Sequence, residues 1–200
     1  KELKKYKTFD YSFNPNFNNW LPFYWNGYKQ TTYYSYRINQ SSINMFNNYN
    51  KNLKYEINCA LKSELSFEKN CNIDAFYNTL ENTFKRQKCR IPFKKDKIEY
   101  FIKELSQKNA IKLFQVIDNK NQIQSVCGVV YDHKCSYFIL NGSNYTTSIR
   151  GSNHYLLHNT ILEMLNYSPI FDFEGSMIPS IESFYRGFGP ILTSYSRIWK

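Results

Sequence analysis

The sequence lacks several patterns that commonly reveal the class of a protein. Its five cysteines include no C-x-x-C pair and make an odd number, so neither a zinc knuckle nor a disulfide framework is indicated. No apolar run approaches the roughly 18 residues of a membrane span, and the visible start carries no signal peptide. We therefore expect no transmembrane segment and a location in the reducing cytoplasm, with Cys127 and Cys135 buried in strands.

Histidine is scarce, and its placement gives little sign of a metal. His154 and His158 stand four residues apart, as zinc ligands can, but Tyr155 occupies the place of the glutamate in H-E-x-x-H. No third ligand is evident. We expect no metal and interpret both histidines as polar helix surface.

Positive charge is in surplus, chiefly in the first half. Lys and Arg number 26 against 16 Asp and Glu, a net charge of +10. Residues 1–100 hold 17 basic and 9 acidic side chains, and residues 101–200 hold 9 and 7. Such a surplus can attract tRNA, a nucleotide-sugar, the phosphates of coenzyme A or an anionic membrane face. The alternative is compositional drift, because Lys, Asn, Tyr and Ile are abundant throughout.

Hydrophobic periodicity divides the chain into alternating helices and strands. Helical spacing predicts helices over 41–62, 73–86, 97–108, 152–165 and 179–186. Strands are predicted over 28–38, 65–67, 111–117, 123–131, 135–140, 169–174 and 193–198. Short connections at 118–122 and 132–134 favour an antiparallel meander of the three middle strands. Residues 1–27 are predicted to form a loop, whose aromatic residues either cover the flank of a domain or stack on bases.

Two acids occur at the end of a predicted strand near the C-terminus. Alternation places Asp172 and Glu174 on the face opposite Phe171 and Phe173. Gly175 then ends the strand, and a short helix begins at about residue 179. A buried strand that ends in carboxylates and leads into a helix is typical of an active site.

The same stretch carries a resemblance to a known family. Asp172-Phe-Glu-Gly-Ser followed by Ile-Glu-x-Phe-x-x-x-Phe-Gly189 resembles the closing signature of FemAB-like acyltransferases, a branch of the GNAT superfamily. A second patch, Trp20-Leu-Pro-Phe-x-Trp-x-Gly27 with Thr-x-Tyr-x-Tyr after it, resembles the segment that joins the two halves of such proteins.

The resemblance implies a fold and a domain organisation. The fold would be a GNAT-like α/β (α+β) domain with a mixed, mostly antiparallel central sheet flanked by helices. Residues 1–40 would be the tail of a preceding GNAT-like half with the connecting segment, and residues 41–200 the acyltransferase domain. We accordingly expect a fragment of a longer, bacterial two-lobed protein that lacks its N-terminal half here.

The resemblance also implies roles for the two acids and their neighbours. Asp172 and Glu174 would serve catalysis or acceptor binding, because acyl transfer to an amine needs a group that accepts a proton. The alternative is that one acid caps the following helix or orders the turn at Gly175. Tyr137 and Ser176 are candidate hydroxyls for the substrate and the tetrahedral oxyanion.

In GNAT enzymes the acyl donor's pyrophosphate binds the helix start that follows the fourth strand. The corresponding residues here are Arg150, Gly151, Ser152 and Asn153. The usual Arg/Gln-x-x-Gly-x-Gly/Ala pattern is not cleanly present, since Ser148 stands in the place of its basic residue. A phosphate-binding loop and a plain helix N-cap therefore both remain open.

The final helix departs from the Fem pattern. Fem-type aminoacyltransferases commonly have Phe-Lys-x-x-Phe-Gly there, whereas this chain has Tyr185 in the place of the lysine and Arg186 one position later. Both are candidate substrate-binding residues. The departure shifts the preference from an aminoacyl-tRNA donor towards acyl-CoA, such as acetyl-CoA.

Three functional hypotheses follow. The first is an N-acyltransferase that uses acyl-CoA on an amino-sugar or another nucleotide- or lipid-linked amine, in polysaccharide or cell-envelope synthesis. The second is an aminoacyl-tRNA-dependent transferase that acts on a peptidoglycan precursor, with tRNA as a partner. The third is a binding module that keeps the fold without turnover. No role with DNA is expected.

Overall fold

The computed structural model describes residues 5–41 and 45–200. In chain order the elements are β1 (Asp10–Ser12), α1 (Leu21–Tyr24), β2 (Lys29–Asn39), α2 (Met45–Asn48), α3 (Lys51–Lys62), β3 (Ser66–Glu68), α4 (Ile73–Arg86), α5 (Lys95–Gln107), β4 (Ile111–Ile117), β5 (Ile123–Tyr131), β6 (Ser136–Ser143), α6 (Ser152–Met164), β7 (Ile170–Asp172), α7 (Pro179–Arg186) and β8 (Ile191–Trp199).

The eight strands form a single mixed sheet in the order β1-β8-β2-β7-β6-β5-β4-β3. Strands β4, β5 and β6 make the antiparallel meander that their short connections predict. Only β6 and β7 run parallel, and they pair over two positions, Ser136 with Phe171 and Tyr137 with Asp172. The mixed, mostly antiparallel sheet predicted from the sequence is thus confirmed.

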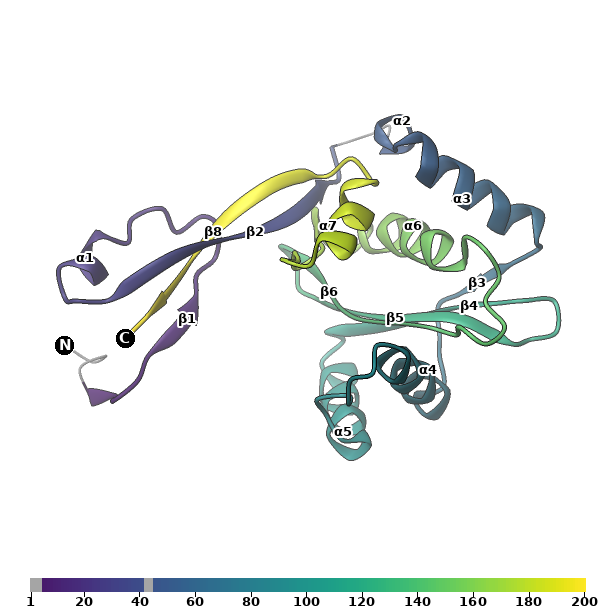
Figure 1. Cartoon of the computed structure of the whole chain (residues 1–200), viewed down its shortest axis with the longest axis horizontal. Helices are drawn as coiled ribbons and strands as arrows, with labels where there is room; N and C mark the ends of the chain where they lie inside the picture. Colours follow the sequence, from purple (N-terminus) through teal and green to yellow (C-terminus); the bar gives the residue numbers. More distant parts are fainter. Residues whose placement is uncertain (1–4, 42–44) are drawn as a thin grey trace.

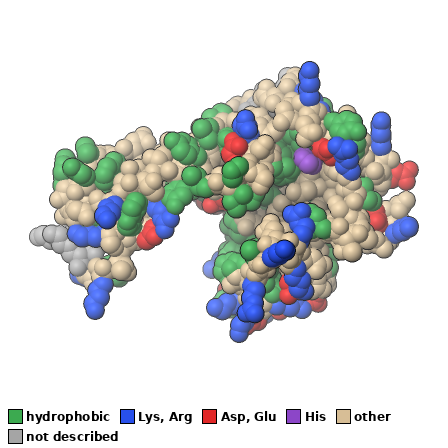
Figure 2. Space-filling model, in the orientation of Figure 1, with side chains coloured by type: hydrophobic (Ala, Val, Ile, Leu, Met, Phe, Trp, Pro, Cys, Tyr) green, Lys and Arg blue, Asp and Glu red, His purple; other side chains and the backbone are tan. Residues whose placement is uncertain are grey.

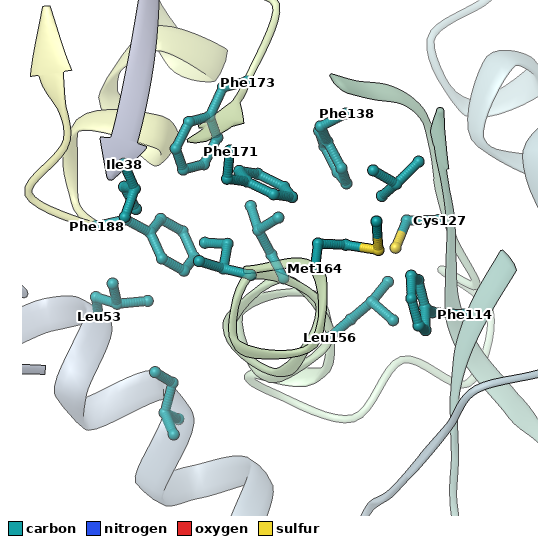
Figure 3. Close-up of a cluster of buried hydrophobic side chains, with 14 of the residues drawn as sticks. Ile38, Leu53, Phe114, Cys127, Phe138, Leu156, Met164, Phe171, Phe173 and Phe188 are labelled. Atoms are coloured by element: carbon teal, nitrogen blue, oxygen red, sulfur yellow. The ribbon is translucent and has the colours of Figure 1, made fainter. Parts of the chain in front are cut away.

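Helices cover both faces of the sheet (Figure 1). Helices α3, α6 and α7 lie on one face, and α4 and α5 lie on the other. The larger core fills the space around α6, where Phe138, Phe171, Phe173, Phe188 and Met164 converge (Figure 3). A second core lies between α4, α5 and the meander, around Phe76, Leu80 and Ile102. Among the described residues, no helix has the length and apolarity that crossing a membrane requires.

Strands β2 and β8 reach beyond the helix-covered body as a long arm (Figure 1). They pair antiparallel from Lys29 with Trp199 to Arg37 with Ile191. Strand β1 adds to the far end of β8, and α1 packs beside the outer end of β2. The inner end of β2 pairs with β7, so the arm and the body share one sheet.

The structure corrects three predictions about local structure. The loop predicted over 1–27 contains β1 and α1 in its described part, because long-range pairing with β8 makes a strand of Asp10–Ser12. The helix predicted over 41–62 is divided into α2 and α3, since the Asn50 side chain accepts a hydrogen bond from the Leu53 N–H at 2.7 Å and starts a new helix; residues 42–44 lie outside the described residues. The strand predicted over 169–174 ends at Asp172.

Candidate functional site

The two acids of the closing signature line one pocket. It has a volume of about 330 Å³ and opens where β6, β7, β2 and β8 meet. Its lining comprises Ser12, Phe13, Asn14, Pro15, Ser35, Arg37, Tyr137, Asp172, Glu174 and Tyr195. Asp172, Glu174 and Tyr137, three residues predicted from the sequence, therefore come together in space.

Asp172 is buried and fully engaged by its neighbours. Its carboxylate accepts hydrogen bonds from the Ser35 hydroxyl, from Arg37 Nε at 2.6 Å and from the Glu174 N–H at 2.8 Å. Arg37 is itself mostly buried, so the ion pair is shielded from water. This arrangement fixes the Asp172 carboxylate and also orders the turn that follows β7.

Glu174 is held in an unusual backbone conformation. Its φ is +61°, in the left-handed region that residues with a side chain rarely adopt. Gly175 follows with φ +69°, and a Cβ at that position would lie 2.0 Å from the Tyr34 carbonyl oxygen. The close approach of β2 therefore requires glycine at 175. With the backbone bent in this way, the Glu174 side chain lines the pocket beside Asp172.

The pocket shifts the proton affinity of its titratable groups. Burial is the largest cause that raises the pKa of Glu174, and the negative charge of Asp172 is the second. The positive charge of Arg37 opposes this rise. Burial also raises the pKa of Tyr137 to about 12 and, together with the two carboxylates, raises the pKa of Tyr195. Glu174 still reaches solvent at the pocket edge, so it is the acid that can exchange a proton with a substrate.

Strands β6 and β7 part directly beyond the pocket. After Tyr137 and Asp172 the two strands have no further pairing, so the β7 side of β6 is left open. At the same place β6 has a bulge: Phe138 is opposite Val129 and Leu140 is opposite Gly128, which leaves Ile139 as the extra residue. Backbone N–H groups of β6 that are not hydrogen-bonded to either neighbouring strand are candidate donors to a developing oxyanion.

The predicted donor loop is packed against α3. Arg150 makes a forked ion pair with Glu56, with Nη2–Oε1 at 2.7 Å and Nε–Oε1 at 3.0 Å, and these hydrogen bonds lower the pKa of Glu56. Gly151 has φ +83°, and a Cβ there would lie 2.0 Å from the Glu56 carbonyl oxygen. Ser152 is buried, and the buried Oδ1 of Asn153 has no hydrogen-bond partner among the residues that the structure describes. The one cation of the loop is therefore already paired with a carboxylate, and a phosphate would have to compete with Glu56.

The loop and the acid pocket lie at opposite ends of β6. Ser143, at one end, pairs with Ser125, whose hydroxyl donates to the Ser152 carbonyl at 3.2 Å. Tyr137 lies six residues away on the same strand, a separation of roughly 20 Å at about 3.3 Å per residue. The structure thus does not join Arg150–Asn153 and Asp172 in one pocket. A molecule that reached both would have to be long and pass between the parted strands.

The remaining predicted site residues lie outside the acid pocket. The Ser176 hydroxyl accepts a hydrogen bond from the Ile178 N–H at 3.1 Å and so orders the entry to α7. Tyr185 packs into the larger core beside Phe138 and Phe173, and burial raises its pKa to about 12. Arg186 is exposed and pairs with Glu182 at 3.1 Å.

The two helix histidines are not polar surface, contrary to expectation. His158 Nδ1 lies 3.1 Å from the Tyr49 hydroxyl, and the His154 ring packs against Phe184. Burial lowers the pKa of both, because α3 and α7 pack over this part of α6. Within the described ranges, no three His, Cys, Asp or Glu side chains are grouped to hold a metal ion.

Sequence reasoning missed the other seven residues of the pocket lining. Residues 12–15 come from the end of β1 and the segment after it, β2 supplies Ser35 and Arg37, and β8 supplies Tyr195. The pairing that places β2 between β7 and β8 joins residues more than half of the chain apart. A charged residue within a run rich in Thr and Tyr was the available signal for Arg37.

Comparison with known proteins identifies the fold. No protein-family model and no curated protein matches the chain. Among the solved structures that resemble it are FemX (11% identity, TM-score 0.71, 82% of this chain and 61% of FemX), the C-terminal domain of a proposed lysylphosphatidylglycerol synthetase from Agrobacterium fabrum (10%, 0.66, 86% and 62%), and a tandem GNAT protein from the clavulanic acid biosynthesis pathway (8%, 0.61, 96% and 63%).

The chain therefore has a GNAT-like fold, and the resemblance to FemAB-like GNAT proteins is confirmed at the level of the fold. The chain spans about three fifths of the length of these structures. At such low identity, the likeness extends to the architecture alone.

Proposed function

We propose that the chain is the transferase domain of an N-acyltransferase that moves an acyl or aminoacyl group to an amine. The observation that carries the proposal is the pocket in which Glu174 stands beside the fixed Asp172–Arg37 pair, at the point where β6 and β7 part. The GNAT-like fold supports the same reaction class, since a region named as a GCN5-related glucosamine N-acetyltransferase has a similar structure.

Glu174 is the general base of this proposal. It takes a proton from the acceptor's ammonium group, and the neutral amine nitrogen then attacks the carbonyl carbon of the donor. The bond from that carbon to the donor's sulfur or oxygen breaks, and the leaving group departs with the electron pair and takes up the second proton, which the nitrogen loses as the amide forms. The raised pKa suits Glu174 to this task, because a base works best when its pKa lies near the working pH.

Asp172 and Arg37 act as positioning residues. The Asp172 carboxylate accepts hydrogen bonds from Ser35, Arg37 and the Glu174 N–H, so both of its oxygens are already engaged by the protein. Its negative charge supports the raised pKa of Glu174, and its bond to the Glu174 N–H holds the turn. The sequence-based alternative that one acid orders the turn at Gly175 fits Asp172.

An acyl-CoA donor is the first candidate, with its acyl end between β6 and β7 and its phosphates at the start of α6. Asp172 alternates with Phe171 along β7 and lines the acid pocket, so it faces away from the core. The rings of Phe171 and Phe173 lie in the core on the side that α6 covers (Figure 3). Donor and acceptor would thus approach from opposite faces of the sheet. The acceptor class that we propose is an amino-sugar or another cell-envelope amine.

An aminoacyl-tRNA donor is the second candidate. The Arg150–Glu56 ion pair favours it, because the start of α6 then offers a pyrophosphate no unpaired side-chain cation of its own. Among the similar structures is FemX, and a nucleotide- or lipid-linked precursor would be the matching acceptor.

A transfer assay tests the proposal. Acetyl-CoA with glucosamine, and aminoacyl-tRNA with a peptidoglycan precursor, are supplied in parallel, and product is measured by mass spectrometry. We expect E174Q to lower turnover by about 10²- to 10⁴-fold with the productive donor. The matched variant E104Q, which changes an acid on α5, should retain full turnover.

Two outcomes would contradict the proposal. Unchanged turnover in E174Q would exclude Glu174 as the base. Binding of donor or acceptor without turnover of either pair would favour the third hypothesis, a binding module on the same fold.

A further inference from the structure

The connection between α4 and α5 is strongly basic and faces solvent. Seven of the 13 residues from 85 to 97 are Lys or Arg, and one, Asp96, is acidic. All of them except Ile91 are exposed. Figure 2 shows Lys and Arg side chains gathered over the α4–α5 end of the molecule. The charge surplus of the first half is thus concentrated on one surface.

Much of this charge is not neutralised within the protein. Lys95 pairs with Asp74, and Lys85 pairs with Glu81. In the described part of the chain, the other lysines and arginines of the connection have no carboxylate partner: Arg86, which stacks on Tyr145, and Lys88, Arg90, Lys94 and Lys97. The cations can therefore bind an external anion.

An apolar pocket of about 380 Å³ opens beside these cations, between α5 and β6. It is lined by Phe93, Lys97, Ile98, Phe101, Ile139 and Leu140. Phe93 is 52% exposed, Phe101 40% and Ile139 38%. Ile139 is the bulged residue of β6, which explains why a large apolar side chain of the sheet is left uncovered.

We propose that this basic and apolar surface docks on an anionic membrane, with a lipid acyl chain in the pocket and the cations against the headgroups. An amphiphile fits both halves of the surface: lysines and arginines attract anionic headgroups, and Phe93, Phe101 and Ile139 gain by leaving water. The positive charge of the connection between α4 and α5 complements the negative charge of an anionic leaflet.

RNA fits the surface less well. Base edges need hydrogen-bonding partners, and Lys97 is the one polar side chain of the pocket lining. A helical stem held through its phosphates would bind the cations but would leave the apolar pocket in water. An aliphatic chain needs no such partners.

The pocket lies close to the acid pocket. Tyr137 and Ile139 are two residues apart on β6, about 7 Å along the strand. A lipid held in the apolar pocket would therefore present its headgroup next to Glu174. This consequence rests on the proposed function, whereas docking itself does not require any transfer.

Vesicle co-sedimentation tests the docking. The chain is mixed with phosphatidylcholine vesicles that contain or lack phosphatidylglycerol. We expect binding to the anionic vesicles that weakens as salt rises. K94Q/K97Q should weaken it roughly 25-fold, since each cation near the surface contributes about fivefold. F93S/F101S should weaken binding at every salt concentration.

Matched variants control for charge and apolarity elsewhere. K51Q/K62Q removes two exposed lysines of α3, and L61S/L162S replaces two exposed leucines on α3 and α6. Both should bind as the unaltered chain does, and thermal melts verify that every variant is folded. K94Q/K97Q and F93S/F101S should still acylate a water-soluble amine if the chain has that activity.

Several results would overturn the inference. One is the absence of binding to both kinds of vesicle. Another is binding that neither K94Q/K97Q nor F93S/F101S alters. If only the lysine variant weakens binding, the acyl-chain site is refuted. If the unaltered chain binds tRNA in filter binding but does not bind vesicles, and K94Q/K97Q no longer binds tRNA, the surface is an RNA-binding surface.

Discussion

Glu174 combines a left-handed backbone with a carboxyl group that partly loses its hydration. Neither property is visible in an alternating pattern, which treats Asp172 and Glu174 as equivalent residues of a strand. The structure separates them: Asp172 is fixed by three donors, and Glu174 is turned into the pocket by the bend that Gly175 allows. The difference between the two acids arises from their neighbours on β2.

The raised pKa of Glu174 predicts a displaced acidic limb in the pH–rate profile. A base is active when deprotonated, so activity should fall as pH drops through a pKa above the ordinary value of 4.5. The profile of kcat/KM against pH measures this limb. Residual activity in E174Q should lack it, and D172N should move it towards lower pH, because the repelling charge is removed. A limb that stays in place in E174Q would show that another group is titrating.

The Glu56–Arg150 pair predicts how the start of α6 responds to charge removal. Glu56 has a lowered pKa, so the pair stabilises the fold above pH 4.5, and this stability is lost as pH falls through the lowered value. If donor phosphates bind there, E56Q removes their competitor for Arg150. We expect E56Q to bind coenzyme A about fivefold more tightly by isothermal titration, and R150Q to bind it more weakly. Equal affinity in E56Q and the control E104Q would contradict a phosphate site at this loop.

At the scale of single elements, the sequence predicted most helices and strands closely. The stripe of Phe76, Tyr77 and Leu80 predicted α4 with the bounds that the structure shows, because one strongly periodic face packs on the sheet. Strands β4 and β5 also have their predicted bounds. Errors occurred where distant segments decide the structure: β1 exists because β8 pairs with it, and β7 stops where Tyr34 approaches Gly175.

The residues of the candidate site were likewise predictable only where local sequence decides their position. Asp172 and Glu174 could be predicted together because one motif holds both, whereas Tyr137 was a candidate hydroxyl that the sequence could not place beside them. Ser35, Arg37 and Tyr195 could not be predicted, because they depend on the register of β2 against β7 and β8. The histidines of α6 were wrongly interpreted as surface, since the packing of α3 and α7 over that helix leaves no mark in the local sequence.

His158, one of the two half-buried histidines of α6, predicts that acidification weakens the fold. Burial lowers the pKa of His158 below its ordinary value of 6.5, so the folded state binds fewer protons than the unfolded state. Stability is full above pH 6.5 and declines as pH falls below it. Thermal melts between about pH 7.5 and 5 should show a falling Tm. H158Q should reduce that fall, whereas H133Q, in the exposed turn after β5, should not; identical pH dependence in all three chains would refute this cause.

At the scale of the whole molecule, the sheet links a helix-covered body to an arm with little cover of its own. The predicted division near residue 40 remains a prediction, although β2 lies within the sheet of the body and pairs with β7 at its inner end. Towards the tip, the arm has a separate aromatic cluster in which Phe23 contacts Phe9, Phe13, Phe17 and Tyr28. The two main cores take no residue from this cluster.

Separate cores predict separate opening of the arm and the body. F23A removes the shared member of the arm cluster, so the amides of β1, the outer half of β2 and the outer half of β8 should exchange hydrogen about tenfold faster or more. Amides of β4 and β5 should keep their protection, because Phe114 and Phe76 hold them in the body. F114A is the contrasting variant: it leaves a cavity in the larger core and should cost about 3–5 kcal/mol of global stability. Hydrogen exchange read by mass spectrometry distinguishes the two patterns. Equal loss of protection in β4, β5 and the arm of F23A would show that the sheet unfolds as one unit.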